Sequence, residues 1–196
     1  MKKLVLSFCV ACSLVTAHAA VYVFDAPLSG LNEFPANNST GVGYTLVNYD
    51  DVANTLRVQV LFARLLGTTT AAHIHAATAL PGQGTAGVAT TVPSFPSFPI
   101  GGTFGSYDYT LNLTSASSYN SAFIAANGGT TAGAQAALVS AMFAGTSYLN
   151  IHSTAFPGGE VRGFLTLVPE PSTFAMLALG GACVAMKSRK KLAARL

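Results

Sequence analysis

The chain has 196 residues, of which 51% are hydrophobic and only 9% are charged, and its formal net charge is +3. This composition excludes an intrinsically disordered tail protein, which combines low hydrophobicity with high charge. Seven of the ten basic residues lie in the first 3 or the last 10 positions, and residues 20–168 carry three arginines against six acidic residues. We therefore expect no nucleic acid among the partners, since binding to phosphates requires a basic patch.

The N-terminal segment has the three parts of a secretory signal peptide. Lys2–Lys3 gives a positive start, Leu4–Val15 is an apolar run, and Ala17 and Ala19 place small residues at a cleavage site. We expect signal peptidase to remove residues 1–19, with a cut one residue later as the alternative. The competing interpretation is a buried N-terminal helix.

The positions of the cysteines agree with export. Cys9 and Cys12 lie in the signal segment and Cys183 lies near the C-terminus, so residues 20–168 contain none. This region has no thiol for a disulfide bond, for CxxC redox chemistry or for thiolate metal ligation. It must fold on its own hydrophobic core, for which its length is ample.

The central region consists of short segments in which apolar and polar residues alternate. Leu56–Phe62, for example, has an apolar residue at every second position, which predicts a strand with one buried face. Clusters of Gly, Pro, Asn and Asp separate these segments, as in a sandwich or barrel. We expect strands at Val21–Phe24, Val42–Tyr49, Leu56–Phe62, Ala72–His75, Val88–Val92, Tyr107–Leu113, Tyr148–His152 and Val161–Val168.

Two stretches, Ser118–Ala126 and Ala132–Phe143, are rich in alanine instead. Apolar residues recur at four-residue spacing in the second stretch, which predicts a helix there. Pro93–Pro99 is expected to be an exposed loop. The predicted fold is mainly β, an immunoglobulin-like or superoxide-dismutase-like antiparallel β-sandwich with a short helical insertion before the last strands.

The C-terminal segment, residues 169–196, reads as a second sorting signal. Pro169-Glu170-Pro171 is followed by the short apolar run Phe174–Met186 and by the basic cluster Lys187–Lys191, which is a stop-transfer, positive-inside pattern. This arrangement resembles the PEP-CTERM sorting signal of Gram-negative bacteria. The resemblance implies transient insertion into the inner membrane, cutting by an exosortase, and a place at the cell surface or in the extracellular matrix. A plain membrane anchor is the alternative, although 13 apolar residues would make a poor one.

Four motifs in the central region occur in a fixed order along the chain. They are Leu28–Pro35 with Gly41–Gly43, Ala72–His75, Tyr148–His152 and Pro157–Gly163. Together they resemble the CHRD domain, first described in chordin, so we assign residues 20–168 to such a domain. The biochemical activity of that family is poorly defined, and ligand binding by chordin does not transfer to a lone domain.

Three histidines in these motifs are candidate metal ligands. His73 and His75 lie two residues apart, so on a strand they project from the same face. Adding His152 gives a set that could hold zinc or copper. The two alternatives are histidines that hold loops by hydrogen bonds to the backbone, and acid–base catalysis.

A polar network is the structural alternative to a metal. Asn150 shares a strand face with His152, and Glu160 shares one with Arg162. A hairpin turn at Ser153–Gly159 would bring Glu160 close to His152 and Arg162. We expect these residues and the three histidines to cluster at one end of the sandwich.

Two functions from different classes follow. The first is a non-enzymatic module of the cell envelope or extracellular matrix, linked to exopolysaccharide or biofilm and binding a matrix polysaccharide or protein. The second is an extracellular metal-binding protein or metalloenzyme. We assign no catalytic residue, because the chain contains no Gly-rich phosphate loop, no GxSxG motif and no HExxH motif. The expected cofactor is accordingly none, or a zinc or copper ion.

Overall fold

The computed structural model describes residues 20–169. The predicted signal peptide with Ala17 and Ala19, the pair Glu170 and Pro171, and the apolar segment Phe174–Met186 lie outside the described residues. Across the described range, no helix has both the length and the apolar character needed to cross a membrane.

Eight strands form one antiparallel sheet, so the prediction of a mainly β, antiparallel fold is confirmed. The order of strands is β4-β6-β7-β1-β2-β3-β5, and β8 pairs with β1 beside β7. The strands are β1 (Val21–Ser29), β2 (Val42–Asp50), β3 (Thr55–Ala63), β4 (Thr69–His75), β5 (Gly105–Asn112), β6 (Tyr148–Ser153), β7 (Val161–Phe164) and β8 (Thr166–Leu167).

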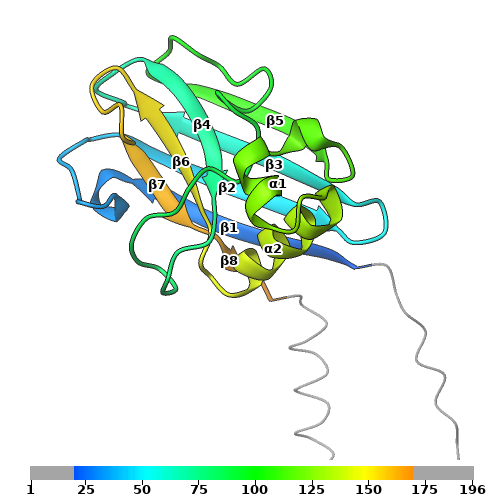
Figure 1. Cartoon of the computed structure of the whole chain (residues 1–196). Helices are drawn as coiled ribbons and strands as arrows, with labels where there is room; N and C mark the ends of the chain where they lie inside the picture. The colour runs from blue at the N-terminus through cyan, green and yellow to red at the C-terminus, as the bar shows by residue number, and fades with distance from the viewer. Residues whose placement is uncertain (1–19, 170–196) are drawn as a thin grey trace, which may run out of the picture.

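The sheet curls, so that β4, β6 and β7 lie in front of β2, β3 and β5, with the core between these layers (Figure 1). Val58 of β3, Ile74 of β4 and Ile151 of β6 belong to the same buried cluster. Burial of one face of each strand follows from the period-2 alternation, as β3 shows by burying every second residue from Leu56 to Phe62.

The predicted helical insertion is also confirmed. Helix α2 (Thr131–Phe143) precedes the last three strands, and the short helix α1 (Ser121–Ala126) lies before it. The side chain of Thr130 caps α2 by accepting a hydrogen bond from the backbone N–H of Gly133. The apolar face of α2, which includes Leu138 and Met142, packs into the core.

The prediction of a strand at Val88–Val92 is wrong. This segment makes only isolated bridges, one between Val88 and His75 and one between Thr90 and Tyr119. It runs along the outer edge of β4, where the N–H of Ala89 donates to the carbonyl of Ile74 and the hydroxyl of Thr90 accepts from the N–H of Ile74. The segment therefore protects an edge strand instead of extending the sheet.

Two other expectations need correction. Pro93–Pro99 is a loop, but it is not exposed along its length, because Phe95 and Phe98 are buried. Their rings pack on core aromatic rings, and these contacts place the loop over the edge of the core. The predicted last strand, Val161–Val168, is divided into β7 and β8 at the buried residue Leu165.

Candidate functional site

The candidate site lies on the outer surface of β4, β6 and β7. Residues of β4 and β6 that point inward, such as Ile74 and Ile151, belong to the core. The intervening positions point outward, and the strand register pairs His73 with Asn150 and Asn150 with Arg162. The residues on this surface are His73, His75, Tyr148, Asn150, His152, Arg162 and Phe164.

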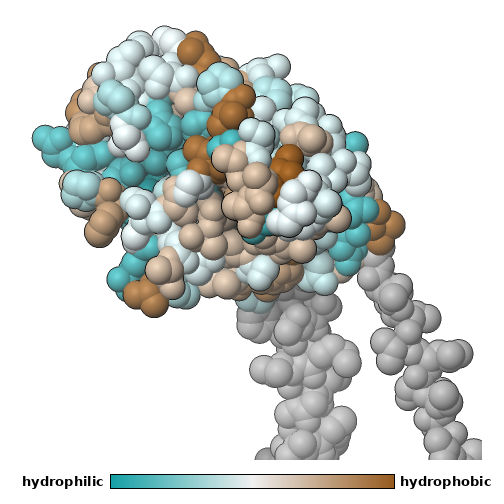
Figure 2. Space-filling model, viewed as in Figure 1, coloured by the Kyte–Doolittle hydropathy of each residue, from teal (hydrophilic) through white to brown (hydrophobic). Residues whose placement is uncertain are grey.

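Loops cover this outer surface, so most of its polar side chains are buried although they point away from the core. Only 6% of His73, 3% of Asn150 and 2% of Arg162 is exposed. The cover comes from the segment after β1, from residues 80–93 and from the turn between β6 and β7, which all contribute hydrogen bonds to the site. Figure 2 shows hydrophilic residues gathered on the part of the surface where β6 and β7 lie in Figure 1.

The rings of His73, His75 and His152 lie close to one another, in edge-on or tilted arrangements. The ring centroids lie 5.7 Å apart for His73 and His75, 5.2 Å for His73 and His152, and 5.9 Å for His75 and His152. One nitrogen from each ring can be chosen so that all three atoms lie within 4.8 Å of one another. The structure thus brings together the three candidate metal ligands named from the sequence.

Each ring also has a fixed tautomer. His73 Nε2 lies 2.5 Å from the carbonyl oxygen of Pro93, and His75 Nδ1 and His152 Nδ1 each lie 2.9 Å from a backbone carbonyl oxygen. A carbonyl can only accept, so the nitrogen beside it must carry the proton. The other nitrogen of each ring is left with a lone pair and is buried without a hydrogen-bond partner among the described residues.

Burial keeps these rings neutral. Burial lowers the pKa of His75 to about 4, and the hydrogen bond to Ala86 opposes this effect only in part. Burial also lowers the pKa of His73 and that of His152 from their usual value. Neutral imidazole is the form that binds a metal ion, and a backbone carbonyl that holds the far N–H orients the ring for this purpose.

Arg162 fastens two of the covering loops to the sheet. Its Nε donates to the carbonyl of Asn32, its Nη1 donates to the carbonyl of Gly84 at 2.9 Å, and its Nε lies 3.7 Å from Oε2 of Glu33. The guanidinium also lies 4.6 Å above the ring of Tyr148, which is itself stacked on His75. Arg162 therefore connects the histidine cluster to the segment after β1.

Glu160 does not make the pairs expected with His152 and Arg162. It is fully buried, and its carboxylate accepts hydrogen bonds from the hydroxyl of Ser39 and from the backbone N–H groups of Leu66 and Gly67. Burial raises its pKa, but hydrogen bonds from Ser153, from Ser39 and from the two loop N–H groups bring the pKa below the usual value. Because loop N–H groups supply the donors, Glu160 holds the β3–β4 loop instead of the histidines.

Glu33 belongs to the site although it was not predicted as a site residue. It follows the 3-10 helix Gly30–Asn32 that comes after β1, and it is 9% exposed. Burial raises its pKa to about 7 despite the opposing effect of Arg162. The sequence does contain one signal for this role, because Glu33 lies in Leu28–Pro35, the first of the four motifs. The pairing of β1 with β7, at Ser29 and Arg162, carries it to the site.

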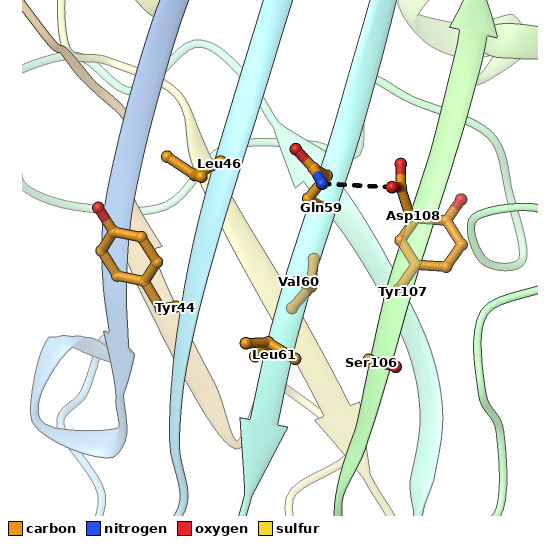
Figure 3. A pocket seen from close by; sticks show the side chains of 8 residues that line it. All are labelled: Tyr44, Leu46, Gln59, Val60, Leu61, Ser106, Tyr107 and Asp108. Carbon is orange, nitrogen blue, oxygen red and sulfur yellow. Dashed lines mark hydrogen bonds between the residues drawn. The ribbon is translucent and has the colours of Figure 1, made fainter.

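Two of the hollows among the described residues have charged side chains in their lining. One, with a volume of about 400 Å³, is lined by Glu33, Arg162 and the exposed side chain of Phe34. The other, of about 350 Å³, is a groove on the outer surface of β2, β3 and β5, and Figure 3 shows Tyr44, Leu61 and Asp108 along it. Only the first hollow adjoins residues of the candidate site.

Comparisons with known proteins agree with both resemblances seen in the sequence. The family model described as "CHRD domain" matches residues 24–165, and the model described as "PEP-CTERM protein-sorting motif" matches residues 167–190. No match was found among curated proteins or among solved structures. The sorting motif implies export, sorting to the cell surface, and an exosortase as the processing partner.

Proposed function

The chain belongs to the CHRD domain family, and we propose that its domain binds one transition-metal ion outside the cell through His73, His75 and His152. The sorting motif makes the protein an exosortase-sorted extracellular protein. The observation that carries the metal proposal is the cluster of three neutral imidazole rings. One nitrogen from each ring lies within 4.8 Å of the others, and each ring has one buried nitrogen without a hydrogen-bond partner among residues 20–169.

A purely structural role for the histidines fits this observation less well. Each ring is already held by one backbone carbonyl, so the second nitrogen adds no hydrogen bond to the fold. A buried polar atom without a partner costs about 1–3 kcal/mol. Three such atoms in one cluster of rings would together destabilise the fold, and a bound metal ion would remove this cost.

The donor set favours zinc or copper. Imidazole nitrogen suits both ions, and residues 20–168 provide no thiolate. A tetrahedral ion with ligand bonds of about 2.0–2.1 Å would separate its nitrogens by about 3.3 Å. One nitrogen from each ring lies within 4.8 Å of the others, so modest rotations of the rings would complete the site.

The experiment is a metal titration of the full chain with Zn²⁺ and with Cu²⁺, followed by calorimetry and by elemental analysis. We expect one ion per chain. His73→Ala, His75→Ala and His152→Ala should each weaken binding more than about 100-fold, since loss of a supporting group alone costs 10–100-fold. Gln59→Ala, on the exposed surface of β3, is the matched control and should bind normally. If the wild-type chain binds no stoichiometric metal, the metal proposal is wrong and the histidines have a structural role.

The sorting motif favours a second role that is compatible with the first. We propose that the processed protein resides in the extracellular, exopolysaccharide-rich matrix as a module that catalyses no reaction. Its transient insertion into the inner membrane before processing is part of this proposal. Fractionation of the native host tests it. Recovery of the processed chain in the matrix is expected, and recovery of the unprocessed chain in the membrane alone would contradict it.

A further inference from the structure

Five buried polar atoms without a hydrogen-bond partner lie on the same outer surface of the sheet. Seven such side-chain atoms occur among the described residues, and the other two belong to Tyr107 and Ser147. Three of the five are the histidine nitrogens already discussed. The remaining two are oxygen atoms, Oδ1 of Asn150 and Oε1 of Glu33.

Asn150 lies between the histidines and Glu33. In the sheet its neighbour on one side is His73 of β4, and its neighbour on the other side is Arg162 of β7. Arg162 in turn lies 3.7 Å from the carboxylate of Glu33. Asn150 therefore lies beside His73 in the sheet, and Arg162 connects it to Glu33.

The two oxygens approach each other at Gly159. A Cβ atom placed on this glycine would lie 2.7 Å from Oδ1 of Asn150 and 2.8 Å from Oε1 of Glu33. Only a residue without a side chain leaves room for both groups there. The side-chain amide of Asn150 and the carboxylate of Glu33 therefore both lie close to Gly159. Both residues are at least nine-tenths buried.

Above the pKa of about 7, Glu33 is ionised, so its carboxylate oxygen and the amide oxygen of Asn150 are both acceptors and cannot satisfy each other. Two neighbouring acceptors require a small group with two hydrogens to donate. Water is such a group, and a three-histidine metal site characteristically keeps its fourth position for water. A water molecule can bind the metal through its lone pair while its two hydrogens remain available.

We propose that the fourth ligand of the metal is a water molecule whose two hydrogens are accepted by Oδ1 of Asn150 and Oε1 of Glu33. This inference rests on the proposed metal site, and it gives every one of the five unpartnered atoms a partner. Asn150 and Glu33 are then positioning residues. The carboxylate of Glu33 would then lie between the bound water and the hollow of about 400 Å³.

The test uses the full chain loaded with Cu²⁺ and electron–nuclear double resonance. We expect strongly coupled protons that disappear when the solvent is D₂O, as a coordinated water gives. A chain that binds no copper contradicts the proposed function. A loaded chain without exchangeable coupled protons contradicts only the present inference, because the metal site then exists without the water.

Two neutral variants of Glu33 separate positioning from charge. Glu33→Gln keeps an acceptor oxygen, whereas Glu33→Leu does not. Azide should therefore displace the water about tenfold more readily in Glu33→Leu than in Glu33→Gln, since one lost hydrogen bond is worth about a factor of ten. Asn150→Leu should behave like Glu33→Leu, and Gln59→Ala should match the wild type. Equal azide affinity in the two Glu33 variants would overturn the inference.

Discussion

Two ion pairs lie on the outer surface of the same sheet, and their surroundings are opposite. Arg57 and Asp108 join β3 to β5 at 2.5 Å, with about half of each side chain exposed. Arg162 and Glu33 lie 3.7 Å apart, with side chains 3% and 7% exposed. The hydrogen bond from Arg57 lowers the pKa of Asp108, whereas burial raises the pKa of Glu33 to about 7.

The difference comes from the loops and not from the strands. On β2, β3 and β5 the outer surface is open, so water can solvate polar side chains such as Arg57 and Asp108. On β4, β6 and β7 the covering loops separate the polar groups from bulk solvent, so each must find a protein partner, a ligand or a bound water. The same strand alternation therefore produces an ordinary surface in one region and a candidate binding site in the other.

The largest expected effect is that of Arg162→Ala. This change leaves the carbonyls of Asn32 and Gly84 without their donor and leaves Glu33 buried without its cation. We expect the free energy of unfolding to fall by about 3–5 kcal/mol, as when one partner of a buried pair is removed. Urea unfolding measures this, with Arg57→Ala as the control. A loss below about 1 kcal/mol would show that water can enter the covered region.

A pH series on Glu33→Gln tests the buried carboxyl group. The pKa of Glu33 rises from 4.5 to about 7 on folding, so its stabilisation is complete below pH 4.5 and is lost as the pH rises through 7. The glutamine stays neutral throughout. Between pH 4 and pH 8 the variant should therefore gain on the order of 3 kcal/mol in unfolding free energy relative to the wild type. A pH-independent difference would mean that folding does not change the pKa of Glu33.

Gly163→Ala tests the close packing beneath the covered surface. A Cβ at this position would lie 2.3 Å from the carbonyl oxygen of Pro27 and 2.9 Å from Cβ of Ala26, so β1 would have to move. We expect a loss of about 1–3 kcal/mol, as for other overpacked sites. Gly158→Ala, where the new atom meets nothing within 4 Å, should leave the unfolding free energy almost unchanged. Equal effects of both substitutions would argue against the tight β1–β7 contact.

The smallest effect is expected for the open pair. A double-mutant cycle with Arg57→Ala and Asp108→Ala should give a coupling energy of about 0.2–1 kcal/mol, because exposed pairs are solvated and screened by salt. The coupling should decrease further in high salt. A coupling above about 2 kcal/mol would show that the open surface is less solvated than its exposure indicates.

Strand alternation made much of the fold and part of the site predictable. The period-2 pattern of β3 and the alanine-rich pattern of α2 both form the predicted elements. The same alternation predicts that His73 and His75, two residues apart, share one face of their strand. Their rings are indeed neighbours, with centroids 5.7 Å apart. These predictions succeeded because they depend on neighbours within a few residues.

The errors concern contacts between residues far apart in the sequence. Val88–Val92 has the composition of a strand, but the edge of β4 binds it through a threonine side chain and isolated bridges. Glu160 meets Ser39 and Leu66 across more than 90 residues. Glu33 reaches the site only because β1 lies beside β7. No local pattern contains that information.

The most direct measurement is a crystal structure of the metal-soaked protein, with anomalous diffraction recorded at the zinc or copper absorption edge. We predict one strong anomalous peak bonded to Nδ1 of His73, Nε2 of His75 and Nε2 of His152, the three nitrogens that have no partner among the described residues. This mixed set follows from the carbonyls that hold the other three nitrogens. A structure with no peak there, and with the histidines hydrogen-bonded to one another or to water instead, would contradict the account.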